Sequence, residues 1–129
     1  MQRGKEVRKV AMLAVVVAVV VLAFAGVALA VNKTCTKDPC RGTEAKDTLR
    51  EQTEDGVDDN ISGRKNADKI DASGYEDDVD DLRGGSGNDN LDAEDGDPDD
   101  VLNGGKGTDT CNGDNGDDSE NCEKGNLAD

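Results

Sequence analysis

The chain has 129 residues, a formal net charge of −15, no histidine, no tryptophan, one tyrosine and one phenylalanine. A segment this acidic repels nucleic acids and anionic membrane surfaces, which excludes both as partners of the acidic part. Without histidine, and with too few aromatic residues to line a substrate cleft, the chain is not expected to be an enzyme.

Residues 1–30 have the pattern of a helical secretory signal peptide. A basic stretch with Arg3, Lys5, Arg8 and Lys9 leads into an uncharged apolar run from 10 to 31, which ends in the small-residue pattern Ala28-Leu29-Ala30. An uncleaved membrane anchor is the alternative, because a bilayer needs roughly 20 apolar residues. In both cases the remaining domain, 31–129, lies outside the cytoplasm, secreted or at the cell surface.

Removal of 1–30 leaves 11 basic and 29 acidic residues, a formal net charge of −18, and Tyr75 as the only aromatic residue. This composition is typical of a disordered chain, because little apolar surface is available to offset the entropy of ordering. The domain therefore requires another source of stability.

Two cysteines, Cys35 and Cys40, stand near the start of this domain. In an exported chain they are expected to form a disulfide with each other. A zinc site made of four cysteines is the alternative; neither cysteine pair has the two-residue gap common in such sites.

An Asp-x-apolar pattern then recurs along the chain. The pairs are Asp38 with Cys40, Asp47 with Leu49, Asp59 with Ile61, Asp68 with Ile70, Asp77 with Val79, Asp80 with Leu82, Asp89 with Leu91, Asp100 with Leu102 and Asp109 with Cys111, and a degenerate member, Glu120 with Cys122, follows. Most apolar positions are nine residues apart, and the other steps are interpreted as insertions. Each repeat predicts a six-residue turn and a strand of about three residues with one inward side chain, which gives a core only one or two side chains wide.

Two copies of the repeat share three glycines and an aspartate: GGSGNDNLD at 84–92 and GGKGTDTCN at 104–112. The glycines allow positive φ and close approach of the backbone to an ion, and the aspartate supplies a charged oxygen ligand. A weaker copy, GRKNADKID at 63–71, has Asn66 at a glycine position. Asparagine tolerates the left-handed conformation best among the other residues, so this copy can still turn.

A second cysteine pair, Cys111 and Cys122, falls on apolar positions of the repeat, so both side chains are predicted to face the interior. A disulfide between them would cap the end of the stack, as Cys35 and Cys40 would at the start.

The glycine-aspartate pattern resembles the RTX, or haemolysin-type, calcium-binding repeat, whose consensus is Gly-Gly-x-Gly-x-Asp-x-apolar-x, over about residues 36–122. The resemblance implies an all-β domain, a right-handed parallel β-roll of nonapeptide repeats, with turns that stack about every 18 residues and calcium between them. The Glu94–Asp99 insertion and the three-residue slip from Val79 to Leu82 should interrupt this stacking, which leaves two to four sites.

The resemblance also implies the calcium ligands. They are the carbonyl groups of Gly84, Gly85, Gly87, Gly104, Gly105 and Gly107 and the side chains of Asp89 and Asp109, to which the weaker copies add Asn66, Asp68 and Asp100. Because the ion cancels charge that opposes collapse, calcium binding and folding are expected to be one event.

Two other interpretations of the domain are open at this level. The Asp-rich segments at 92–100 and 114–120 are similar to EF-hand or thrombospondin type 3 loops, without the spacing or helices of an EF-hand. Alternatively, the domain is an acidic disordered segment that binds divalent cations without specificity. No feature of the sequence identifies a protein or polysaccharide partner.

Overall fold

A computed structural model describes residues 29–52, 57–74 and 78–126. The predicted signal peptide lies outside these residues except for its last two. The ten strands are β1 (Asn32–Thr34), β2 (Cys40–Arg41), β3 (Thr48–Arg50), β4 (Asn60–Lys65), β5 (Lys69–Asp71), β6 (Asp81–Ser86), β7 (Asn90–Ala93), β8 (Val101–Lys106), β9 (Thr110–Gly113) and β10 (Asp118–Glu120). No helix occurs among the described residues, and so none that could cross a membrane.

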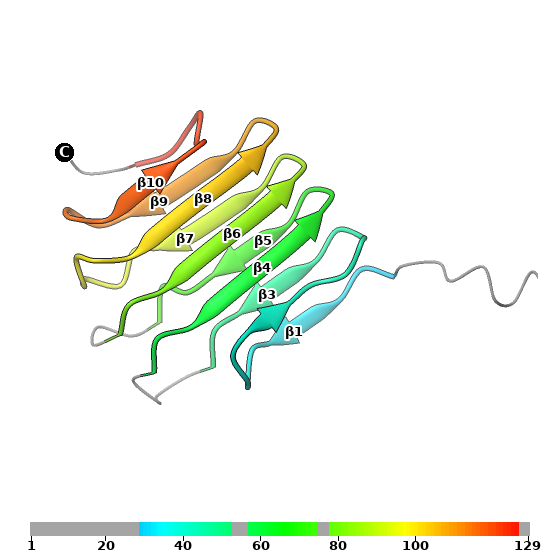
Figure 1. Ribbon diagram of the computed structural model, residues 1–129, viewed down its shortest axis with the longest axis horizontal. Coiled ribbons are helices and arrows are strands. Elements are labelled where there is room, and N and C mark those ends of the chain that lie inside the picture. The colour runs from blue at the N-terminus through cyan, green and yellow to red at the C-terminus, as the bar shows by residue number, and fades with distance from the viewer. Residues whose placement is uncertain (1–28, 53–56, 75–77, 127–129) are drawn as a thin grey trace, which may run out of the picture.

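The strands alternate between two parallel sheets. One sheet has the order β1-β3-β5-β7-β9 and the other the order β10-β8-β6-β4-β2, so the chain crosses from one sheet to the other after every strand. The result is a β-solenoid whose coils stack along its length (Figure 1). The predicted all-β parallel roll is confirmed, and the disordered interpretation does not describe these residues.

The central coils are longer than the predicted 18 residues, whereas the first and last strand pairs join residues 16 and 17 positions apart. Hydrogen bonds between equivalent aspartates of neighbouring coils link Asp68 to Asp89, 21 residues apart, and Asp89 to Asp109, 20 residues apart. From a strand of the second sheet to the next strand of the first, the inward side chains are nine residues apart, as in Leu82 to Leu91. On the way back to the second sheet they are eleven or twelve apart, as in Leu91 to Leu102. The long steps are thus a regular part of the central coils, and stacking is not interrupted where insertions were predicted.

A narrow apolar core runs between the sheets. One column contains Leu49, Ile70, Leu91 and Cys111, and the other contains Cys40, Ile61, Leu82 and Leu102, each in register with its neighbours. All are 0–1% exposed, whereas Val79 points outward and is 39% exposed. The predicted core, one or two side chains wide, is confirmed, with Leu82 and not Val79 as the inward residue.

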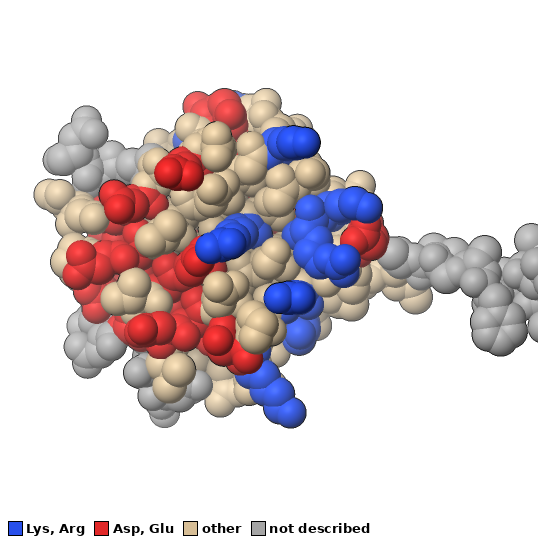
Figure 2. Space-filling model, viewed as in Figure 1, with Lys and Arg blue, Asp and Glu red and all other residues tan. Residues whose placement is uncertain are grey.

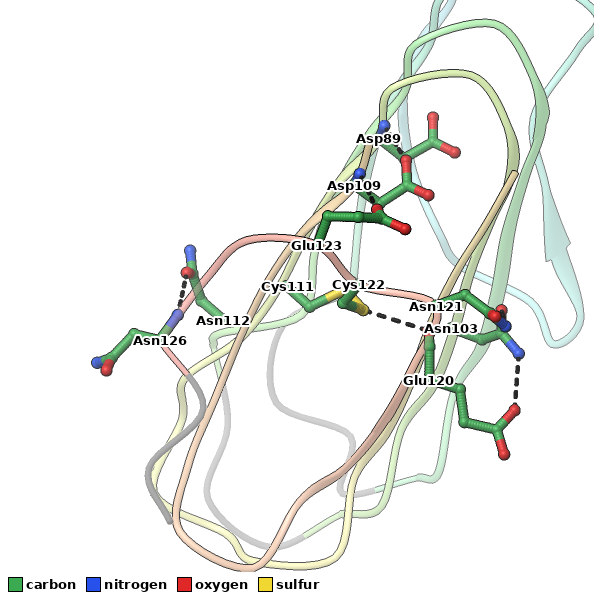
Figure 3. The surroundings of a disulfide bond; sticks show 10 residues. All are labelled: Asp89, Asn103, Asp109, Cys111, Asn112, Glu120, Asn121, Cys122, Glu123 and Asn126. Carbon is green, nitrogen blue, oxygen red and sulfur yellow. Dashed lines mark hydrogen bonds between the residues drawn. A yellow bond between two sulfur atoms is a disulfide. The ribbon is translucent and has the colours of Figure 1, made fainter. Parts of the chain in front are cut away.

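Both predicted disulfides are present, Cys35 to Cys40 and Cys111 to Cys122. The C-terminal pair differs from the prediction in one respect, because Cys122 is only half-buried and Ser119 takes the strand position next to Leu102. Cys122 instead ties the segment after β10 onto β9 through the disulfide with Cys111 (Figure 3). In the same place the Cys111 N–H donates to the Lys124 carbonyl. Two disulfides are typical of proteins in an oxidising, extracellular environment.

Candidate metal centre

Two kinds of turn connect the sheets, at opposite edges of the solenoid. The short turns lead from the second sheet to the first. Counted from their first glycine they comprise 42–47, 63–68, 84–89 and 104–109, and the last three of these ranges include the final three residues of β4, β6 and β8. The long turns lead from the first sheet to the second and comprise 51–59, 72–80, 94–100 and 114–117, with 53–56 and 75–77 outside the described residues. Aspartates end both kinds of turn.

The aspartates that end the short turns form a hydrogen-bonded ladder. The Asp68 N–H donates to Asp89 Oδ1 and the Asp89 N–H to Asp109 Oδ1, both at 2.7 Å. The ladder begins with the Val31 N–H on Asp47 and ends with the Asp109 N–H on the Glu123 carboxylate (Figure 3). One carboxylate oxygen per coil thus binds the backbone, and the chain fixes the stacking of coils through these side chains.

The first glycine of each short turn makes room for the ladder. A Cβ atom at Gly84 would lie 2.4 Å from Asp89 Oδ2, and one at Gly63 would lie 2.3 Å from Asp68 Oδ2. Such distances are far below van der Waals contact. The spacing of five residues between glycine and aspartate therefore serves the packing of a buried carboxylate.

Positive φ occurs at the next positions of the short turns. Gly85 and Gly87 have φ values of 107° and 146°, and the equivalent residues one coil earlier, Arg64 and Asn66, have values of 89° and 67°. The prediction that Asn66 adopts a left-handed conformation is confirmed. Arg64 shares this conformation without being glycine, aspartate or asparagine.

At the long turns, three aspartates from two coils converge. Asp80 and Asp100 precede β6 and β8, and Asp95 lies within the turn between β7 and β8. One ligand oxygen from each of the three lies within 4.8 Å of the others. We call Asp80, Asp95 and Asp100 the long-turn cluster.

Each member of the long-turn cluster has one oxygen bound to the backbone and one without a partner. Oδ1 of Asp80 accepts a hydrogen bond from the Asp59 N–H. In the same way, Oδ1 of Asp100 accepts from the Asp80 N–H, and Oδ1 of Asp95 accepts from the Asp97 N–H. Oδ2 of all three is buried and has no hydrogen-bond partner. Asp80 and Asp100 are 0% exposed. A buried carboxylate oxygen without a partner is costly, so this cluster needs a cation or a proton.

Burial and mutual repulsion change the acidity of these groups. Burial, together with the charges of Asp78, Asp100 and Asp59, raises the pKa of Asp80 to about 7. For Asp100, burial and the charges of Asp95, Asp117 and Asp97 raise the pKa to about 7. Burial and neighbouring carboxylates also raise the pKa of Asp95. The folded chain therefore disfavours the ionised cluster when no cation is bound.

No basic side chain within the long turns can compensate this charge, because their sequences contain no lysine or arginine. The short turns carry Lys46, Arg64, Lys65 and Lys106. In Figure 2 the acidic side chains gather at the lower left, where Figure 1 places the long turns, and basic ones at the right. Over the described residues, no ion pair reaches the long-turn cluster.

The structure divides the predicted metal ligands between the two edges. Asp100 belongs to the long-turn cluster. The others lie at the short turns: Gly84, Gly85, Gly87, Asp89, Gly104, Gly105, Gly107, Asp109, Asn66 and Asp68. There, Oδ2 of Asp68, Asp89 and Asp109 is buried without a hydrogen-bond partner, so the chemistry of these carboxylates also fits a cation. Calcium at the short turns stays a prediction.

Asp80 and Asp95 were not predicted as metal ligands. Asp80 was identified as a repeat position, and Asp95 stands in the segment 92–100 that was compared with an EF-hand loop. They could have been predicted from the spacing of the apolar positions. Steps of eleven and twelve residues recur regularly between these positions, and this period places the acidic segments of successive coils side by side.

No known family, curated protein or solved structure shows significant similarity to the chain. The fold and the two aspartate rows therefore define the class: a parallel β-solenoid with stacked buried carboxylates and a carboxylate cluster able to hold a cation.

Proposed function

We propose that the protein is an exported calcium-binding module in which the long-turn cluster holds the ion. The observation that carries the proposal is the convergence of Asp80, Asp95 and Asp100, each with a buried oxygen that lacks a partner. The ion would neutralise charge between two coils and so stabilise their stacking. We propose for it a structural or cell-surface role without catalysis.

The choice of calcium rests on ligand chemistry and spacing. Calcium takes six to eight oxygen ligands at 2.3–2.6 Å, so oxygens on opposite sides of one ion are about 5 Å apart. The limit of 4.8 Å between the cluster oxygens is compatible with that separation. Magnesium binds at about 2.0–2.1 Å with strict octahedral geometry and retains several waters, which suits a buried three-carboxylate cluster less well.

The resemblance to the RTX repeat supports the same ion from the sequence side. Two short turns carry the full glycine-aspartate pattern, and the stacked parallel coils are the architecture that the resemblance implies. The coil of 20 or 21 residues and the acidic long turns distinguish this chain from the nonapeptide pattern. We propose an RTX-like protein with an additional acidic edge.

The test is calorimetric titration with calcium and with magnesium. Asp95→Asn and Asp100→Asn should each weaken calcium binding about tenfold or more, because each removes a charged ligand. Asp99→Asn is the matched control, since it removes the same charge from an exposed neighbour of Asp100. Equal calcium affinity in all three variants would overturn the assignment of the ion to this cluster.

A further inference from the structure

The edge formed by the short turns carries a row of basic side chains. Three of the four short turns contribute to it, and all four residues are exposed: Lys46, then Arg64 and Lys65, then Lys106. Because parallel strands stack about 4.8 Å apart, these side chains extend over about 15 Å along the edge. We call these four residues the basic row.

The basic row keeps most of its charge. The one acidic residue among the exposed or half-buried side chains of the short turns is Glu44, which pairs with Arg64 Nη2 at 2.8 Å and with the Lys65 ammonium group. Lys46 and Lys106 take part in no ion pair among the residues that the structure describes. Four basic groups against one acidic group leave a net charge of +3 on the surface of this edge.

An exposed apolar side chain lies at the same edge. Thr43 Oγ1, in the first short turn, donates a hydrogen bond to the Leu29 carbonyl at 3.3 Å. The Leu29 residue is 71% exposed, the highest value for a large apolar residue in the described part of the chain. Basic side chains beside an exposed leucine are typical of a surface that contacts lipid, in which the cations meet the headgroups and the apolar group enters the interface.

The acidic edge does not prevent such a contact. Strand β4 begins next to the long turn and ends with Lys65, and its five steps of about 3.3 Å span roughly 16 Å. The Debye length at physiological ionic strength is about 8 Å, so the long turns lie about two screening lengths behind the basic row. The repulsion expected from the net charge of the chain therefore applies to an approach by the acidic edge.

We propose that the short-turn edge is a docking surface for an anionic lipid membrane, with the basic row on the phosphate headgroups and Leu29 in the interface. A lipid surface is favoured over a soluble polyanion because an exposed leucine gains nothing from a polyanion in water. The inference goes beyond the proposed calcium binding and does not depend on which residues hold the ion.

Acetylation of lysine side chains, read by mass spectrometry, tests this surface. The full chain is mixed, in constant millimolar calcium, with vesicles of phosphatidylcholine alone or of phosphatidylcholine and phosphatidylglycerol. Only the second kind should protect Lys46, Lys65 and Lys106, and high salt should abolish the protection. Lys37, exposed between β1 and β2 at the opposite edge, should stay reactive. Insertion of the apolar run 10–31 would act equally on both kinds of vesicle, so it cannot produce this difference.

Replacing both Lys46 and Lys106 by glutamine removes two charges without breaking an ion pair. Each basic residue near an anionic membrane contributes a factor of about five, so the docking constant, read from protection of Lys65, should fall about 25-fold. Lys37→Gln is the control at the opposite edge and should leave the constant unchanged.

Three results would overturn the proposal. They are equal protection of Lys65 in the double variant and the wild-type protein, equal protection by both kinds of vesicle, and protection of Lys37 together with the basic row. Protection by soluble polyphosphate but not by anionic vesicles would also overturn it, because the edge would then bind a polyanion and not a membrane.

Discussion

Gly84 and Asp89 show how the aspartate of the repeat requires a glycine five positions earlier. The buried carboxylate of Asp89 occupies the space beside Gly84 that any larger side chain would fill. This explains the first glycine of the motif through packing, without reference to an ion. The second and third glycines serve a different purpose, the positive φ of the turn.

Gly84→Ala should therefore destabilise the protein by about 1–3 kcal/mol through overpacking. The matched control is Gly74→Ala, where the nearest atom would lie at 3.7 Å. Urea unfolding in excess calcium measures both. Equal midpoints for the two variants would contradict the packing role of Gly84.

The buried carboxylates predict an unusual pH dependence of stability. The pKa values of Asp80 and Asp100 are raised to about 7 and that of Glu51 to about 8, above their values in an unfolded chain, near 4. Their contribution is complete below pH 4 and is lost as the pH rises through 7 to 8. The calcium-free protein should thus unfold at a lower temperature at pH 8 than at pH 5.

Calcium should reverse that trend, because the ion requires the ionised carboxylates and protons compete with it. Thermal melts from pH 5 to pH 8, with calcium and with chelator, provide the measurement. A calcium-free midpoint that does not fall over this range would show that these groups are solvated in solution.

At the scale of elements, the C-terminal segment closes the end of the stack. Glu123 ends the aspartate ladder, Lys124 pairs with the edge of β9, and the Cys111–Cys122 disulfide holds both in place (Figure 3). At the other end, the Cys35–Cys40 disulfide spans only five positions, against eleven here.

Replacing Cys111 and Cys122 together by alanine should lower stability by about 2–3 kcal/mol even with calcium present. The corresponding double variant of Cys35 and Cys40 should cost about 0.7 kcal/mol less, because it opens a shorter loop. Thermal denaturation under saturating calcium compares them. An unchanged midpoint for the C-terminal pair would reject its capping role.

The elements also show how far the sequence could predict the structure. The nonapeptide pattern covers a short turn and its two flanking strands, so the inward residues Leu82 and Leu91 and the turn at Asn66 were correctly predicted. The long turns could not be predicted from the nonapeptide pattern, because their sequences share no glycine positions. In addition, Asp77 and Val79 have the Asp-x-apolar spacing of a repeat although Val79 is not a core residue. The pairing of Leu82 with Leu102 reveals the true period, and it depends on contacts between coils.

The long-turn cluster could not be predicted from the sequence pattern for the same reason, because it too depends on contacts between coils. Asp80 and Asp95 are 15 positions apart and belong to different coils, and only the stacking brings their carboxylates together. The disulfide partners, by contrast, are close in sequence and were predicted correctly.

At the scale of the whole molecule, the narrow core makes stability dependent on charge neutralisation. One inward aliphatic side chain per strand buries little apolar surface, while rows of carboxylates are buried beside it. We expect the calcium-free chain at pH 8 to be largely unfolded and to gain strand structure on adding calcium. Circular dichroism in chelator and in millimolar calcium measures this; identical strand content would contradict it.

The separation of charge between the two edges has a consequence for orientation. Every coil places its acidic turn on the same side, so the contributions add to an electric dipole that lies across the solenoid and not along it. In front of a charged surface the molecule should lie on its side, with the axis of the coils parallel to that surface. Calcium on the acidic edge would weaken this dipole and release the preferred orientation.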